Sequence, residues 1–235
     1  MSGFRWLVLL LLLLLAGCNT TSQHDSPVKT RQFQMGDIAK SDVDMVAEIQ
    51  IQFSMEHLRE LMEKLYRRNP REWRKGGAAT LEQALARVFG TARTGHFPEL
   101  QGKKGTDAIM LTFDERYRGD RVLAFVEGLR GMLLAAHNGK QVFYFTDELD
   151  PQKLYNAARN IEIATWKLGH TRDSEGRLFL ISNETAGPVI NLSYERLFGK
   201  LIALQDGMAR IVAQSSNRRI KTIIQSVASA VFLPI

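Results

Sequence analysis

The sequence predicts a mainly α-helical domain, a bundle of about six or seven helices with at most one small β-hairpin. Three observations predict it. Apolar side chains recur at helical spacings in several long segments, residues that favour helix caps stand at the starts of those segments, and 45% of the chain is hydrophobic. A chain of 235 residues is long enough to bury such a core. Burying one Leu-sized side chain contributes about 1.5 to 3 kcal/mol, so we expect the apolar stripes to decide the fold.

The first helix is predicted over residues 38–66. Ser41 and Asp44 form a capping pair inside this stretch, so we expect its first turn to be separate. Asn69-Pro70 ends the helix, because proline disfavours helical geometry in the residue before it. The apolar face of this helix consists of Val43, Val46, Ala47, Ile51, Met55, Leu58, Leu61, Met62 and Leu65.

Three shorter elements follow. Thr80 and Gln83 predict a capped helix that ends at Phe89-Gly90. Residues 91–105 hold three glycines and Pro98, which predicts a long exposed loop of a kind that is often functional or mobile. Residues 106–117 predict another short helix.

Four further helices with apolar stripes are predicted over residues 122–136, 150–169, 193–212 and 220–231. Asn138-Gly139 ends the first of them, and Asp150-Pro151 starts the second in the favoured order of cap and then proline. Residues 142–145 and 178–181 are the strand candidates, because both are short, apolar and bounded by turn residues. The two segments can pair as a hairpin, but such runs are equally compatible with turns of buried helix.

The N-terminal segment has the layout of a secretory signal. Arg5 supplies a positive charge ahead of an apolar run over residues 6–16, and small residues stand where such a signal is cut. The run is much shorter than the roughly 20 residues that a membrane-spanning helix needs. We therefore expect the segment to be removed from the mature protein.

Leu15-Ala16-Gly17-Cys18 resembles the lipobox of bacterial lipoproteins, in which Leu and two small residues precede a cysteine. The resemblance covers only these first residues. It implies cleavage between Gly17 and Cys18, a diacylglycerol thioether on Cys18 and acylation of the new amino terminus. In that family the next residue influences sorting, and Asn19 implies the inner leaflet of the outer membrane, facing the periplasm. The alternative is a cytosolic protein with an apolar start and a buried free cysteine.

This interpretation divides the chain into three parts: a signal peptide over residues 1–17, a lipidated N-terminus and tether over residues 18–36, and one helical periplasmic domain over residues 37–235. Few large apolar residues occur in the tether, so it is not expected to bury a core. Because Cys18 is the single cysteine, the domain has no internal disulfide and depends on its apolar core. We predict the membrane and an envelope protein as partners, and the periplasmic location excludes nucleic acid.

Motifs for catalysis are not found. The sequence contains no nucleophile elbow, no zinc-protease motif, no Walker loop and no cysteine pair, so we predict no catalytic residue, metal or cofactor. Ser26-Pro27-Val28-Lys29 matches the S-x-x-K pattern of penicillin-recognising enzymes, but their further motifs are missing and we interpret the match as chance. His57 and Glu60 have the spacing of a helical metal-ligand pair, but without a second pair we expect a solvated ion pair.

A basic segment after the first helix is a candidate surface for anionic head groups or glycans. It combines guanidinium and ammonium groups with an aromatic ring, which suits contacts with phosphates at an interface. In the alternative interpretation Trp73 fills a gap in the core and the cations extend along its rim. The residues concerned are Arg67, Arg68, Arg71, Trp73, Arg74 and Lys75.

A second candidate site consists of polar residues on and before the helix that starts at Asp150. Asn156 and Asn160 lie one turn apart with Arg159 beside them, which predicts a polar ridge next to the apolar stripe. A buried ridge needs hydrogen-bonding partners, and we expect the preceding acidic residues Asp147 and Asp150 to supply them. In the alternative, these carboxylates serve as general acid and base in a cleft.

Two functions from different classes follow. The first is a non-catalytic accessory lipoprotein that binds an envelope partner through exposed helix faces and the glycine-rich loop. The second is an envelope enzyme or a carrier of a small ligand or lipid, with its site between helices near residues 147–160. The lipid anchor and the missing catalytic motifs favour the first.

Overall fold

The computed structural model describes residues 35–91, 95–184, 188, 190–216 and 231–235. Two units divide the chain, one ending at Ile38 and the other covering Ala39–Ile235. Seven α-helices occur in the described residues, so the predicted mainly helical class is confirmed. The lipobox, the S-x-x-K match, most of the tether and nearly all of the helix predicted over residues 220–231 lie outside the described residues.

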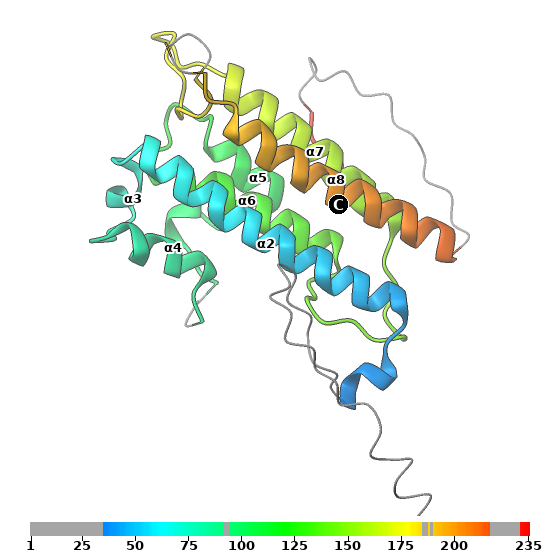
Figure 1. The fold of residues 1–235 in the computed structure, drawn as a ribbon. Coiled ribbons are helices and arrows are strands. Elements are labelled where there is room, and N and C mark those ends of the chain that lie inside the picture. Colours follow the sequence, from blue (N-terminus) through cyan, green and yellow to red (C-terminus); the bar gives the residue numbers. More distant parts are fainter. Residues whose placement is uncertain (1–34, 92–94, 185–187, 189, 217–230) are drawn as a thin grey trace, which may run out of the picture. The chain divides into compact units, whose positions relative to one another are not determined.

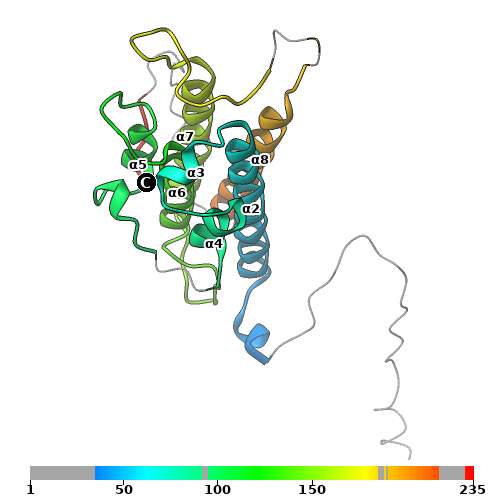
Figure 2. The same ribbon diagram turned by 90° about the vertical axis from the view of Figure 1, so that its left-hand side faces the viewer.

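Four long helices of the second unit form an antiparallel bundle: α2 (Asp42–Arg68), α6 (Arg121–Ala136), α7 (Pro151–His170) and α8 (Ser193–Ser216). Each long helix runs opposite to the one before it (Figure 1). Contacts join α2 to α6, α6 to α7, α7 to α8, and α8 back to α2, which closes the bundle. The second view shows α7 and α8 lying side by side and α5 beside α6 (Figure 2).

Local capping signals set the starts of α2 and α7 as predicted. The short 3-10 helix η1 (Met35–Ala39) is separate from α2, and Ser41 and Asp44 form a reciprocal capping box at the start of α2. Asp150 caps α7, with Pro151 as its first helical residue. These three expectations are confirmed because each depends on residues adjacent in the sequence.

The long connection from α2 to α6 carries four small elements: α3 (Glu72–Lys75), α4 (Leu81–Phe89), η2 (Pro98–Leu100) and α5 (Gly105–Leu111). Thr80 caps α4 through the amide of Gln83, as predicted. Within this connection α4 packs on α2, whereas α3 and α5 pack on α6. Helix α5 is shorter than predicted, because residues 112–120 form turns that return the chain to the start of α6.

Helix α6 is the most buried of the long helices. Twelve of its 16 residues are buried, and the other four, Glu127, Gly131, Leu134 and Ala135, lie on one narrow face. Phe125 makes edge-to-face contacts with Phe113 and Phe198, each with ring centroids 6.2 Å apart. Asn138 and Gly139 end the helix in left-handed conformations, as their sequence predicted.

The two strand candidates do not form a hairpin. Their backbone groups bind other parts of the chain instead of each other: the Phe143 amide donates to Glu48 Oε1 and the Phe145 amide to the Ala39 carbonyl. The Ile181 amide donates to Asn69 Oδ1, and the Ile181 carbonyl accepts from Asn69 Nδ2. Only isolated bridges occur among the described residues, one of them joining Arg172 and Leu178. Contacts with residues distant in the sequence therefore take the place of the hairpin that was one of the two alternatives.

A substitution at Gly128 tests whether α5 lies close against α6. A Cβ added there would lie 2.7 Å from the backbone nitrogen of Ile109 and 2.8 Å from the carbonyl oxygen of Gly105, so α5 would have to move. We expect Gly128→Ala to lower the free energy of unfolding by about 1–3 kcal/mol, measured by urea denaturation.

Gly131→Ala is the matched control, because its nearest neighbour, the backbone nitrogen of Gly105, would be 3.5 Å from the added Cβ. It should leave stability unchanged or raise it, since alanine is the better helix former by up to about 1 kcal/mol. Equal stability of the two variants would contradict the packing of α5 against α6.

Candidate functional site

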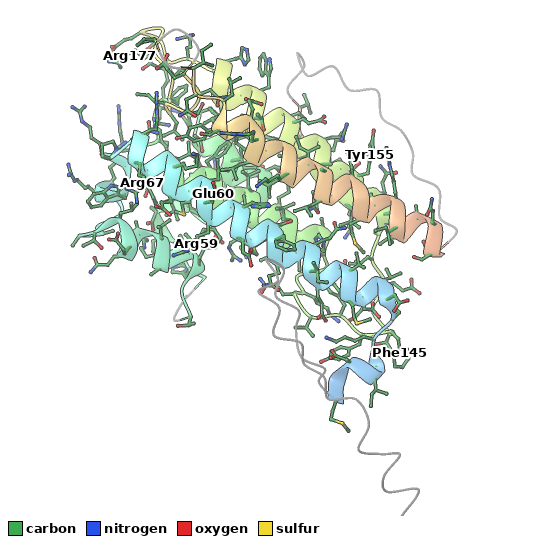
Figure 3. The ribbon with its side chains drawn as sticks, in the orientation of Figure 1. Arg59, Glu60, Arg67, Phe145, Tyr155 and Arg177 are labelled. Atoms are coloured by element: carbon green, nitrogen blue, oxygen red, sulfur yellow. The ribbon has the colours of Figure 1, made fainter. Side chains whose placement is uncertain are left out.

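The predicted basic segment lies at the end of α2 and on α3. Arg67 pairs with Glu63 at 2.7 Å, Arg68 with Glu184 at 3.4 Å, and Lys75 with Glu72 at 2.6 Å. The side chain of Arg67 projects from the end of α2, well away from Phe145 (Figure 3).

Trp73 and its neighbours occupy the same segment. The Trp73 side chain packs partly buried against the core, and the guanidinium of Arg74 lies 4.9 Å above the centre of its ring. Arg71 is exposed. This placement agrees with the alternative in which Trp73 fills a gap in the core. Binding of anionic head groups by the segment stays a prediction.

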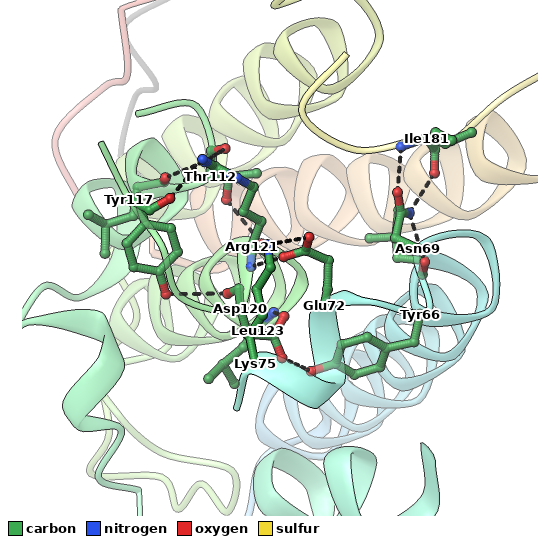
Figure 4. Close-up of polar contacts among 12 residues, drawn as sticks. Tyr66, Asn69, Glu72, Lys75, Thr112, Tyr117, Asp120, Arg121, Leu123 and Ile181 are labelled. Atoms are coloured by element: carbon green, nitrogen blue, oxygen red, sulfur yellow. Dashed lines mark hydrogen bonds and ion pairs between the residues drawn. The ribbon is translucent and has the colours of Figure 1, made fainter. Parts of the chain in front are cut away.

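A buried polar network fixes the start of α6 (Figure 4). The Tyr66 hydroxyl donates to Asp120 Oδ2 at 2.7 Å, and Asp120 Oδ1 accepts from the Leu123 amide at 3.0 Å. Glu72 Oε2 accepts from the Arg121 amide at 2.9 Å. Side chains from α2 and α3 thus hold the first turn of α6, and the negative charge of Asp120 and Glu72 suits that end of the helix dipole.

The guanidinium of Arg121 holds the turns that follow α5. It donates to the carbonyl oxygens of Leu111, Thr112, Asp114 and Tyr117 at 2.6–3.3 Å. It also stacks over the ring of Phe179, 4.9 Å from its centre. One buried cation therefore binds four backbone carbonyl groups, of which those of Leu111 and Asp114 also accept from backbone amides.

Burial perturbs the ionisation of this network. Desolvation raises the pKa of Asp120 to about 6 and raises the pKa of Tyr66 well above its usual range. Perturbed carboxylates are frequent in active sites, but Asp120 and Tyr66 are bonded to each other in the interior. We interpret this network as the structural support of α6.

The structure does not bring the predicted polar set together. Asp147 pairs with Lys140 and accepts from the Tyr144 amide, whereas Asp150 caps α7. Arg159 binds Asp206 at 2.6 Å and Glu162 at 3.1 Å. The acidic residues before α7 are therefore occupied elsewhere, and they do not supply the partners of the asparagine ridge.

The partners of Asn156 and Asn160 come from the C-terminal segment, residues 231–235. Asn160 donates to the Leu233 carbonyl at 2.8 Å and accepts from the Leu233 amide at 2.6 Å, and Asn156 donates to the Pro234 carbonyl at 2.8 Å. Asn156 and Asn160 are buried and Arg159 is partly buried. The C-terminal partners lie more than 70 residues away in the sequence, whereas Asn156 Oδ1 also accepts from Gln152 Nε2 at 2.9 Å within α7.

A cavity of about 580 Å³ lies between the glycine-rich loop, α6 and the C-terminal segment. The predicted loop therefore forms one wall of a cavity. The glycines of residues 91–105 were the only local sign in the sequence that this loop has a special role. Glu127 and Arg130 of α6 form a two-bond ion pair, at 2.7 and 3.2 Å, in the opposite wall. The apolar part of the lining comes from Phe97, Leu100, Ala108, Met132, Leu233 and Ile235.

The described part of the chain carries few histidines and no long, wholly apolar helix. It holds no group of three or more His, Cys, Asp or Glu side chains placed to bind a metal ion. The ring of His57 stacks on Phe53, with ring centroids 6.5 Å apart. No helix within the described residues has the length and apolar character needed to cross a membrane.

Comparisons with protein families, curated proteins and solved structures find no match for this chain.

His137 provides a test of the buried end of α6. Its ring is fully buried beside Phe143, Nδ1 is 2.9 Å from the Leu133 carbonyl oxygen, and Nε2 has no partner among the described atoms. Burial lowers the pKa of His137 below 6.5. At this residue the unfolded chain binds more protons, so the contribution of His137 to the free energy of unfolding should fall as pH drops below about 6.5, whereas the raised pKa of Asp120 contributes in the opposite direction.

The measurement is urea denaturation of the wild type and two variants between pH 7.5 and 5. His137→Leu should lose less stability than the wild type between pH 7.5 and 5, whatever its effect on stability at pH 7.5. His170→Leu, on the exposed end of α7, should keep the wild-type slope. A wild-type slope in His137→Leu would mean that His137 is not held neutral by burial.

Proposed function

We propose that this chain is a lipoprotein of the outer membrane that faces the periplasm and acts as a non-catalytic accessory or interaction protein in the cell envelope. The observation that carries the proposal is the sequence Leu15-Ala16-Gly17-Cys18 at the end of an apolar signal. Cys18 is the lipidated residue, and the acyl chains hold the mature chain at the bilayer. Several acyl chains give a stable anchor where one alone is marginal.

The buried charged groups of the helical domain bond to other groups within the fold, which supports an accessory role. Asp120, Glu72 and Arg121 fix the start of α6, and each is bonded within the fold. The Glu127–Arg130 pair is likewise internal to α6. These groups stabilise the domain, which leaves interactions to exposed surfaces and to the cavity.

Replacement of Cys18 tests the anchor. Cells grown with radioactive palmitate should label the wild-type protein, which should fractionate with outer membranes. Cys18→Ser should be unlabelled, because it lacks the thiol that carries the diacylglycerol. Asn19→Asp serves as the matched control and should be labelled but retained in the inner membrane, as the lipoprotein resemblance implies.

Two results would contradict the anchor. One is a wild-type protein without label, and the other is Cys18→Ser that still fractionates with outer membranes. An unchanged location of Asn19→Asp would leave the anchor standing and overturn only the predicted sorting to the outer membrane.

The cavity supports a second candidate function, a carrier of a small anionic amphiphile. Its volume of about 580 Å³ falls in the range of roughly 300–1,000 Å³ that is typical of ligand sites. Its charged lining consists of Lys103, Lys104, Arg130 and Glu127, so cations outnumber carboxylates. An apolar lining beside an excess of positive charge suits a fatty-acid-like ligand.

Binding of a fluorescent fatty acid tests this candidate. Lys103→Glu combined with Lys104→Glu should weaken saturable binding at least about tenfold, because the carboxylate loses its cationic partners. Arg196→Glu combined with Lys200→Glu, on the exposed face of α8, is the control with the same charge change and should bind normally. Equal losses in both pairs, or no saturable binding by the wild type, would exclude the carrier function.

A further inference from the structure

Three large apolar side chains are exposed together in the connection between α6 and α7. Val142 is 51% exposed, Tyr144 is 42% exposed and Phe145 is 72% exposed. We call residues 142–145 the aromatic loop. Phe145 lies at the end of the domain where α2 begins, far from Arg67 and Arg177 (Figure 3). A cluster of exposed apolar side chains marks an interaction surface more often than an isolated one does.

The aromatic loop is held in place by its own buried residue and by hydrogen bonds. Phe143 is fully buried against His137, and its amide donates to Glu48 Oε1 at 2.9 Å. The amide of Tyr144 donates to Asp147 Oδ2 at 3.1 Å, and the Asp147 amide donates to the Tyr144 carbonyl at 2.7 Å. The fold therefore presents the neighbouring apolar side chains to solvent in a fixed arrangement.

The position of the loop along the chain relates it to the anchor. The amide of Phe145 donates to the carbonyl oxygen of Ala39 at 3.0 Å, and Ala39 is the first residue of the helical unit. Only residues 19–38 separate that unit from Cys18. Twenty residues reach at most roughly 70 Å when fully extended, so acylation at Cys18 would keep the aromatic loop within about that distance of the bilayer and raise its effective concentration there.

The cations beside the loop are neutralised by carboxylates. Lys140 pairs with Asp147, and Lys40 pairs with Glu48 at 2.6 Å, while the Lys40 ammonium also lies 5.5 Å from the centre of the Tyr144 ring. Contacts made by this surface are therefore mainly apolar and aromatic. Aromatic side chains with one polar end favour the interface between lipid tails and head groups.

We propose that the aromatic loop is a membrane-contact surface that inserts Val142, Tyr144 and Phe145 into the phospholipid interface beside the lipid anchor. The inference rests on the proposed lipoprotein function, because the anchor supplies the proximity that makes a weak contact effective. Since the nearby ion pairs are internal, the contact should be insensitive to salt. In this respect it differs from the predicted contact of the basic segment at Arg67–Lys75, which would weaken as salt rises.

A spin label placed beside the aromatic side chains tests the proposal in the intact lipoprotein. In the acylated protein Cys18 is blocked by its thioether, so Val142→Cys gives a single labelling site and keeps Tyr144 and Phe145. The protein is reconstituted into phosphatidylethanolamine–phosphatidylglycerol vesicles. Collisions of the label with oxygen, which concentrates in lipid, are then compared with collisions with a water-soluble nickel chelate.

The measured quantity is the ratio of oxygen collisions to nickel-chelate collisions for the label at position 142. This ratio should be several-fold higher in vesicles than without vesicles, at low and at high salt. Phe145→Ser and Tyr144→Ser added to this background should return the label to water. Ser174→Cys, in the exposed turn near Arg177, is the control site and should report water throughout.

The outcomes separate the loop from the anchor. A label at position 142 that stays in water while mass spectrometry confirms the acyl chains would overturn the loop proposal and leave the anchor intact. A label that is shielded in native membranes but stays in water in the protein-free vesicles would also overturn it, because the loop would then bind a protein. If the chain is not acylated, the same label in Cys18→Ser still tests the loop, since shielding by vesicles supports the proposal and its absence overturns it.

Discussion

The burial of α6 on nearly every side is the constraint on which the rest of the domain depends. Twelve of its 16 residues are buried, so α2, α5 and α7 must all pack against it. Gly128 has no side chain, which lets α5 approach α6 closely, and Phe125 connects α6 to α8 through its contact with Phe198. Polar groups fix both ends: Asp120 and Arg121 at the start, and His137 at the finish. A helix buried this completely tolerates little displacement, so its neighbours are held in one arrangement.

Much of the fold could be predicted because its signals are local. Ser41 and Asp150 cap helices through amides two or three residues away, and the apolar stripes report helical faces directly. The cap of α6 was not predicted, although its signal is equally local: Asp120 accepts from the Leu123 amide three residues on. Only the bond from Tyr66 to Asp120, across 54 residues of sequence, has no local signal. The expected hairpin failed for the same reason. Asn69 binds the backbone of Ile181 across the fold, and no pattern within residues 178–181 reveals that contact.

The candidate sites were predictable only in part. The asparagine ridge on α7 was identified from its spacing, but its partner, the C-terminal segment, follows more than 70 residues later. The cavity draws its walls from the glycine-rich loop, α6 and residues 233–235, so only the glycines gave a local signal. Two places in the domain consequently have different proposed roles. The aromatic loop is the proposed membrane contact, and the cavity is the candidate ligand site.

The central position of α6 is tested most directly by native-state hydrogen exchange of the folded protein across a series of low urea concentrations. If the other helices depend on α6, its amides should exchange only through global unfolding, with the free energy and urea dependence of the whole domain. Amides of α7 and α8 should open at equal or lower free energy. Exchange of α6 in a partial opening, while α7 and α8 remain protected, would show that those two helices fold without it and would contradict this description.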